Sequence, residues 1–195
     1  SSSTAGDATD ILLSIEVEGV RLDDDQIVSI LRNWTAGHGT VVAGLSIVVL
    51  HLAQDIALQN RLRNDPSLIA TAIEEILRVD GPLAANPRTT TREVEIGGRT
   101  IPKGEKLTLM WIAANRDPHA FEKPDVIDIG RCATDSLVWG QGIHACQGAS
   151  MARLEMRVAL EELLARTKKI ECTGEVPRRA IYPSNGLATL SLRFS

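Results

Sequence analysis

The sequence predicts a mainly α-helical fold with small β-hairpins. Apolar residues recur at helical spacing along two long segments, residues 23–62 and 149–169. Between these segments lie short stretches typical of strands, and one pair of them is separated by Gly97-Gly98, a dipeptide that favours a tight hairpin turn. The chain has 195 residues, of which 44% are hydrophobic, so it is long enough to bury one sizeable core.

The first half of the chain is predicted to contain one long helix. Residues 1–9 are small and polar, and they predict a disordered start or a junction ahead of a single domain over residues 10–195. The helix predicted over residues 23–62 opens with three aspartates, which suit the positive end of the helix dipole. Its middle, AGHGT at residues 36–40, contains two glycines, each costing about 1 kcal/mol relative to alanine. We therefore expect local unwinding there, or a group pressed against the backbone.

A shorter helix is predicted over residues 66–80. Asp65 is a typical N-cap, and Pro66 suits the first helical position because its missing N–H has no partner there in any case. Gly81 is expected to end this helix.

The β-structure is predicted as short pieces. Residues 93–101 form the hairpin, residues 106–112 form a further strand, and strand-like pieces surround a turn at residues 182–186. Residues 113–145 are predicted to be mostly irregular, and Arg88 is expected in a loop. An irregular segment of that length is uncommon inside a compact domain and is usually functional.

Charge and cysteine content narrow the function class. A net charge of −4 gives no basic surface for nucleic acid or an anionic membrane. The longest apolar stretch, residues 41–53, is too short to cross a bilayer and contains a histidine, so no membrane segment is expected. Three widely spaced cysteines, with no secretory signal ahead of them, lead us to expect a reduced, cytoplasmic protein.

The segment WGQGIHACQG, residues 139–148, carries the pattern most typical of a functional site. Gly140 and Gly142 before Cys146, and Gly148 after it, permit a tight loop that leads directly into a helix. Backbone N–H groups and the dipole at a helix N-terminus favour the thiolate form of a cysteine. A thiolate is a soft ligand of the kind that haem iron accepts, and Gly148 would let a flat ligand lie close to the helix.

Three other roles for Cys146 stay open on residue type. A buried structural cysteine is the commonest alternative for a free thiol. A zinc site with Cys132 and His144 is disfavoured because structural zinc prefers four ligands in short paired spacings. A nucleophile with His144 as its base is disfavoured because nothing in the glycine loop orients the imidazole.

The same segment resembles the haem-binding loop of the cytochrome P450 family, Phe-Gly-x-Gly-x-His-x-Cys-x-Gly, with Trp139 in place of the phenylalanine. Glu75 and Arg78 in EEILR match the family's Glu-x-x-Arg pair on one helix face, and AGHGT matches the oxygen-side kink of its long helix. ANRDPHAFEKPD and the helix over residues 149–169 resemble the segments on either side of the haem loop.

The resemblance begins near residue 10 and corresponds to the C-terminal half of the family fold, in a bacterial soluble type. It implies a long oxygen-side helix, a Glu-x-x-Arg helix, a haem-binding loop and the helix that follows it. Residues 10–195 would then be a single partial cytochrome P450 domain.

The resemblance also implies a site for haem b, iron protoporphyrin IX. Cys146 would be the proximal ligand of the iron, and Arg88 and His144 would hold the haem propionates. Trp139 would shield the sulfur. Three glycines would shape the cofactor site: Gly140, Gly142 and Gly148.

On the oxygen side, the resemblance implies roles for residues 36–40. The Thr40 hydroxyl would steer protons toward bound oxygen, while Ala36 and Gly37 would open the helix groove. The family carries an acid before this threonine, but here Gly39 stands at that position, and His38 is an imperfect substitute.

Glu75 and Arg78 would be a buried structural pair if the resemblance holds, whereas an exposed helix pair is the alternative. In the family a further basic residue closes a triad with this pair. That residue would fall at Val126, and Arg131 lies nearby but shifted along the sequence.

The function implied is that of a haem-thiolate monooxygenase, here in a truncated form. Such an oxidoreductase uses dioxygen to hydroxylate a C–H bond of a small, mostly apolar organic molecule. Electrons would come from a separate flavin or iron–sulfur partner. The alternative is a non-catalytic, haem-free cytochrome P450 fragment that self-associates, because the missing half would leave a large apolar face uncovered.

Overall fold

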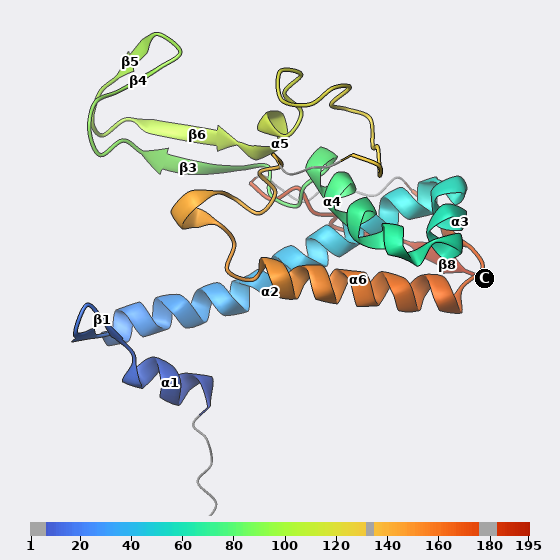
Figure 1. Cartoon of the computed structure of the whole chain (residues 1–195), viewed down its shortest axis with the longest axis horizontal. Coiled ribbons are helices and arrows are strands. Elements are labelled where there is room, and N and C mark those ends of the chain that lie inside the picture. Colours follow the sequence, from blue (N-terminus) through green and yellow to red (C-terminus); the bar gives the residue numbers. More distant parts are fainter. Residues whose placement is uncertain (1–6, 132–134, 176–182) are drawn as a thin grey trace, which may run out of the picture. The chain divides into compact units, whose positions relative to one another are not determined.

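The computed structural model describes residues 7–131, 135–175 and 183–195 (Figure 1). The chain divides into two compact units, residues 1–39 and 40–195.

Some of the predictions fall outside the described residues or stay untested. Three predicted features lie wholly or partly outside the described residues: residues 1–6 of the disordered start, Cys132, and residue 182 at the beginning of the turn over residues 182–186. The single partial domain over residues 10–195 stays a prediction.

The first unit contains a short helix and a two-stranded hairpin before the long helix begins. Helix α1, Ala8–Ser14, is capped by Asp7, whose side chain accepts hydrogen bonds from the backbone of Thr9 and Asp10. Strand β1, Glu16–Val17, pairs antiparallel with β2, Val20–Arg21. Residues 7–9 of the predicted disordered start are described, and they form the capped beginning of α1, where Asp7 and Asp10 make a reciprocal capping box.

Helix α2 spans Asp24–Gln54 without interruption. Asp23 and Gln26 start it with two reciprocal bonds, since each side chain accepts from the other's backbone N–H at 2.8 and 3.0 Å. The local unwinding expected at residues 36–40 is wrong, because these residues are helical throughout. A Cβ added at Gly37 or Gly39 would meet nothing within 4 Å, so packing among the described residues does not require either glycine.

The single helix predicted over residues 23–62 is wrong near its C-terminal end. Helix α2 ends at Gln54, and Asp55 adopts an extended conformation with φ −131° and ψ 94°. The Asp55 side chain accepts from the Leu58 N–H at 2.9 Å and caps a second helix, α3, Ile56–Asn64. The hydrophobic periodicity conceals this break because apolar residues recur on both sides of it.

By length and composition alone, α2 is long and apolar enough to cross a membrane, with a mean hydropathy of 1.6 over its most apolar window. The core helix of a soluble protein passes the same test. Ile47, Val48 and Leu52, near the C-terminal end of α2, are fully buried in the protein core. The absence of a membrane segment stays a prediction.

The helix predicted over residues 66–80 is present. It is observed as a 3₁₀ turn, Pro66–Leu68, followed by α4, Ile69–Val79. As predicted, Asp65 starts it, because its carboxylate accepts from the Ser67 N–H at 3.1 Å.

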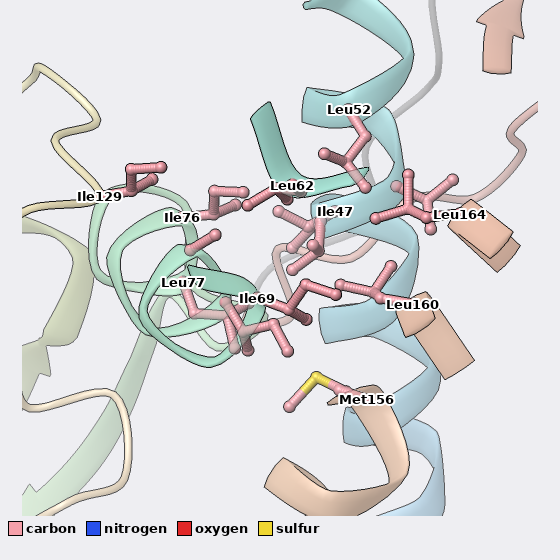
Figure 2. Close-up of a cluster of buried hydrophobic side chains, with 14 of the residues drawn as sticks. Ile47, Leu52, Leu62, Ile69, Ile76, Leu77, Ile129, Met156, Leu160 and Leu164 are labelled. Atoms are coloured by element: carbon pink, nitrogen blue, oxygen red, sulfur yellow. The ribbon is translucent and has the colours of Figure 1, made fainter. Parts of the chain in front are cut away.

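The core of the second unit lies between α2, α4 and α6, Ala149–Arg166 (Figure 2). Apolar residues of α4 recur at helical spacing, so one face of this helix is buried. On α6 a stripe spaced by four residues does the same: Ala152, Met156, Leu160 and Leu164. The buried residues of α2 that complete this cluster include Ile47, Val48 and Leu52, so α2, α4 and α6 share one core.

Three small antiparallel sheets are found among the described residues of the second unit. The predicted hairpin is confirmed as β4, Val94–Ile96, and β5, Arg99–Ile101. The second sheet pairs β3, Ala85–Thr89, with β6, Lys106–Met110, and the third pairs β7, Ile170–Cys172, with β8, Leu192–Phe194.

Two strand predictions need correction. The strand predicted over residues 106–112 ends at Met110, since Trp111 begins a one-turn helix, α5, Trp111–Ala114. Arg88 lies in strand β3 and not in a loop. Pro87 made a strand improbable there, but a two-stranded sheet has an open edge on each strand, where the missing N–H is tolerated.

Gln59 on α3 joins distant parts of the second unit. Its buried amide nitrogen donates to the Leu52 carbonyl at 2.7 Å and to the Ile170 carbonyl at 2.8 Å. Its amide oxygen accepts from the Ile170 N–H at 3.0 Å. One side chain therefore completes the backbone hydrogen bonds at the start of β7, next to the end of α6.

Truncating the core stripe of α6 is expected to destabilise the protein. Leu160 is fully buried, so Leu160→Ala should lower the free energy of unfolding by about 2–5 kcal/mol. Val158 on the same helix is 45% exposed, and Val158→Ala should change it by less than about 0.5 kcal/mol. Urea unfolding followed by circular dichroism measures both, and equal losses would contradict the packing described.

Candidate functional site

The loop over residues 139–148 is shaped by its glycines and one backbone hydrogen bond. The Cys146 N–H donates to the Trp139 carbonyl at 2.7 Å, which closes the loop. Gly140 has φ +70°, and a Cβ there would lie 2.6 Å from the His144 carbonyl oxygen. Only glycine fits this position, so the observed loop conformation requires a glycine at residue 140.

Cys146 lies just before α6, with Gly148 as the N-cap of that helix. Its thiol is free and exposed. The pKa of the Arg153 guanidinium on α6 is raised chiefly by its hydrogen bond to Glu74, and to a smaller extent by the charge of Cys146. Because its thiol is exposed, Cys146 is not the buried structural cysteine of the first alternative.

Trp139, the aromatic residue of the loop, is held from two helices. Its indole N–H donates to Glu74 Oε2 on α4 at 2.9 Å. Arg153 on α6 donates from Nε to Glu74 Oε1 at 2.7 Å, and its guanidinium carbon lies 4.6 Å from the centre of the indole ring. Glu74 thus connects the loop to both helices.

Glu75 and Arg78 form a fully buried ion pair on α4. Arg78 donates from Nε and Nη2 to the two Glu75 oxygens, both at 2.8 Å. Neither side chain is exposed to solvent, which excludes the alternative of a routine surface pair. Arg131 Nε lies 3.0 Å from Glu75 Oε1 and supplies the third member of the triad.

The other contacts of Arg78 attach the irregular segment to α4. Its Nη1 donates to the carbonyls of Asn115 and Pro124 at 2.6 and 2.8 Å, and its Nη2 donates to the Val126 carbonyl at 3.2 Å. Position 126 therefore contributes its backbone oxygen, which any residue supplies. Phe121 lies against the guanidinium, with 4.8 Å between the guanidinium carbon and the ring centre.

The pKa of Glu75 is lowered by its partners. Burial alone would raise this pKa, but the hydrogen bonds from Arg78, the Asp128 N–H and Arg131 outweigh burial and lower it below the ordinary value. Glu75 is therefore ionised at neutral pH, as an ion-paired structural group requires.

Arg88 and His144 lie on different elements. Arg88 is in β3, where its Nη1 donates to the Pro87 carbonyl at 2.8 Å. His144 ends a 3₁₀ turn, Gly142–His144, and is exposed. Among the described residues, no hydrogen bond or ion pair joins Arg88, His144 and Cys146.

The residues predicted for the oxygen side follow one another along α2 and are exposed: Ala36, Gly37, His38, Gly39 and Thr40. The structure places no carboxylate at Gly39, and a Cβ there would extend into open space.

The donor set around Cys146 fits a haem. The site offers one free, exposed sulfur. The zinc alternative stays untested, because Cys132 is not among the described residues. A Cβ at Gly142 or Gly148 would meet nothing within 4 Å, so no described side chain fills the space next to either glycine.

Comparison with known proteins identifies the family. The family model described as Cytochrome P450 matches residues 2–194. The chain belongs to the cytochrome P450 family. Members of this family bind haem b through a cysteine thiolate.

Two curated cytochromes P450 and one solved structure illustrate the similarity. The chain is 40% identical over 164 residues to Cyclomarin C epoxidase CymV of Salinispora arenicola, covering 84% of this chain and 42% of that protein. It is 44% identical over 160 residues to the Biotin biosynthesis cytochrome P450 of Bacillus subtilis, covering 82% and 40%. HmtN, a post-tailoring hydroxylase of himastatin biosynthesis, matches with a TM-score of 0.89 and 35% identity, covering 94% of this chain and 50% of that one. The chain thus spans about half the length of these cytochromes P450 or less.

Sequence reasoning missed Glu74 and Arg153 as parts of the site and left Arg131 open. Glu74 directly precedes Glu75, and two adjacent acids on one helix point in different directions, which was the available signal. Arg153 follows Cys146 by about two helical turns, and nothing in the sequence pairs it with Glu74. The contacts of these residues depend on how α4 meets α6.

Neutralising Glu75 is expected to destabilise the protein and to change its response to acid. Glu75→Gln leaves buried Arg78 without its counter-charge and should lower the free energy of unfolding by about 3–5 kcal/mol at neutral pH. Because the folded state lowers the pKa of Glu75, its contribution is complete above the unfolded-state pKa of about 4.3 and is lost as pH falls through the folded-state value.

Urea unfolding between neutral pH and mild acid tests this expectation. The wild-type protein should lose stability below the unfolded-state pKa more steeply than Glu75→Gln. Glu162→Gln is the matched control, because Glu162 pairs with Arg166 on the exposed face of α6. A Glu75→Gln variant with the wild-type acid profile would contradict the role assigned to this carboxylate.

Proposed function

We propose that this chain is the C-terminal half of a haem-thiolate monooxygenase, with residues 10–195 as its single partial domain. The observation that carries the proposal is the exposed thiol of Cys146, which lies on a family-type loop just before α6. Haem b bound there would supply dioxygen activation and the transfer of one oxygen atom to a C–H bond.

Cys146 would be the iron ligand. Its sulfur lies just before the N-terminus of α6, and the thiolate is the form of cysteine that binds metals. Gly140 gives the loop its turn, while Gly142 and Gly148 leave room for the flat face of the cofactor. Trp139 would shield the sulfur from water, which keeps the thiolate strongly electron-donating.

Arg88 and His144 would hold the propionates. A guanidinium has five N–H donors in a planar fork that matches a carboxylate, and the only hydrogen bond described for Arg88 uses one of them. The exposed imidazole of His144 would donate to a second carboxylate oxygen. Both residues would orient the cofactor without taking part in the chemical step.

On α2, the Thr40 hydroxyl would hold a proton for delivery on the oxygen side, with Ala36 and Gly37 as the small residues that open the groove. His38 is the nearest titratable group along the helix, and Gly39 provides none. We infer that proton delivery is slow in this chain, so that peroxide is used more readily than dioxygen.

The substrate we propose is a small, mostly apolar organic molecule, hydroxylated at a C–H bond. The electron donor would be a separate flavin or iron–sulfur protein, and the protein would act in the cytoplasm without a nucleic-acid or membrane partner. The family membership supports a monooxygenase acting on a small organic substrate.

The second candidate is a haem-free fragment that self-associates. Three apolar residues at helical spacing on α6 are exposed, Met151 at 62%, Leu154 at 52% and Val158 at 45%. Such a stripe is normally covered, and association of two copies would cover it. Sedimentation of the purified chain with and without haem distinguishes a monomeric haem protein from a haem-free oligomer.

The first test of the function is the absorption spectrum of the reduced chain with carbon monoxide. A strongly red-shifted Soret band is expected because a thiolate is the axial ligand. Cys146→Ser should abolish this band, whereas Cys172→Ser should leave it intact, since Cys172 lies in β7. A red-shifted band that survives Cys146→Ser would refute Cys146 as the iron ligand. The absence of any such band after haem is added would favour the second candidate, a haem-free fragment.

Supplying the absent acid is expected to improve turnover. Gly39→Glu places a carboxylate before Thr40 in open space, so peroxide-independent product formation per haem should rise several-fold. Gly37→Glu is the matched control, because it adds the same side chain to the same helix, also in open space. Both variants gain similar helix stability, about 0.5–1 kcal/mol, so equal turnover in the two would refute the proton-delivery role of position 39.

A further inference from the structure

Trp139 is fixed by a closed set of contacts that the proposed function does not use. Its indole N–H donates to Glu74 Oε2 at 2.9 Å, and Arg153 binds both Glu74 oxygens, at 2.7 and 3.3 Å. The Arg153 guanidinium also covers the indole ring at 4.6 Å. We call Trp139, Glu74 and Arg153 the indole clamp.

The indole clamp lies next to the sulfur along the chain and through the backbone. The Trp139 carbonyl accepts the Cys146 N–H at 2.7 Å, so the residue that carries the ring and the residue that carries the sulfur are joined directly. Arg153 lies on the helix that Cys146 precedes, and the charge of Cys146 contributes to the raised pKa of the Arg153 guanidinium after the larger effect of Glu74. A substitution that moves the indole of Trp139 therefore acts on a residue that is hydrogen-bonded directly to the backbone of Cys146.

An indole has a single N–H donor and no acceptor. In this structure that donor is committed to Glu74, so it is not available to Cys146. Hydrogen bonds to a ligating sulfur withdraw electron density from it, and they are among the groups that set the reduction potential of the metal. The acceptor that the indole N–H of Trp139 binds would therefore affect the reduction potential of a haem iron held by Cys146.

We propose that Glu74 and Arg153 are positioning residues that keep the N–H of Trp139 on Glu74 and off the sulfur of Cys146. The sulfur then stays a stronger electron donor than it would be with an indole hydrogen bond. This inference rests on the proposed function, because the sulfur matters as the ligand of haem iron.

A purely stabilising role for the same contacts is the rival explanation. The Arg153 side chain is 46% exposed and the Glu74 side chain 27%, and ion pairs exposed to this degree add little to stability. The rival explanation predicts that loss of Glu74 acts alike whatever aromatic residue stands at position 139. The positioning role predicts that the effect requires an N–H at that position.

The first experiment follows the indole itself and needs no haem. The chain contains three tryptophans, so its ¹⁵N-labelled indole N–H groups give three resonances, and Trp139→Phe identifies the one from Trp139. Glu74→Ala should shift this resonance and speed its exchange with water, and Glu74→Gln, which keeps an acceptor oxygen, should restore most of the wild-type position. The Trp111 resonance is the internal reference, because the indole N–H of Trp111 donates to Asn86 and has no contact with Glu74 among those described. A Trp139 resonance unchanged by Glu74→Ala would overturn the proposal.

The second experiment measures the reduction potential of the haem-loaded chain and the position of its ferrous carbon monoxide band. Glu74→Ala should raise the potential and shift the band to shorter wavelength, because the released N–H can donate to the sulfur. In a Trp139→Phe background, Glu74→Ala should change neither. Equal shifts in both backgrounds, or no shift in either, would overturn the proposal.

The two experiments separate failure of the inference from failure of the proposed function. A wild-type chain that takes up no haem refutes the proposed function, while the indole resonance still decides whether Glu74 holds the N–H. A chain that takes up haem with a thiolate-type spectrum, but whose potential ignores Glu74, supports the function and refutes the inference. Glu162→Ala, which removes an exposed carboxylate from α6, is the control for a general change in surface charge.

Discussion

The buried carboxylate of Glu75 is the interaction on which the rest of the second unit depends. Two guanidinium groups, from Arg78 and Arg131, and the Asp128 N–H all donate to it. Burying an ionised group this deeply is unfavourable unless all of its partners are present, so the segment that supplies them must fold against α4. Arg78 in the same network donates to the carbonyls of residues 115, 124 and 126. These hydrogen bonds fix the conformation of a segment that has almost no regular secondary structure.

The neighbouring carboxylate of Glu74 extends this organisation to the cysteine loop. Consecutive residues on a helix point about 100° apart, so Glu75 faces the irregular segment while Glu74 faces Trp139 and Arg153. Helix α4 thus carries two adjacent acids with different tasks, one buried and structural, the other at the edge of the site. The loop that presents Cys146 is positioned by the same helix that organises the segment leading to it.

Much of this arrangement follows from local sequence signals, and the rest does not. The Gly97-Gly98 hairpin, the Asp65 cap and the α6 stripe were predictable because turn residues, caps and periodicity act within a few residues. The break at Asp55 was missed because the apolar pattern runs through it, and β3 was missed because Pro87 disfavours a strand. The role of Cys146 stays a prediction from its motif. The contacts of Arg131, Glu74 and Arg153 were not predictable, because they join α4 to residues 56 to 79 positions further along the chain.

The amide of Gln59 has a consequence for the order of folding. It joins α3 to the first residue of β7 across 111 positions in sequence, among the longest separations described in this protein. Closing so long a loop is entropically unfavourable before the intervening helices have packed, whereas the contacts within α3 and α4 are local and form early. The Gln59 bridge therefore belongs to the last steps of assembly. Weakening it would mainly shorten the lifetime of the folded protein and leave the rate of its formation nearly unchanged.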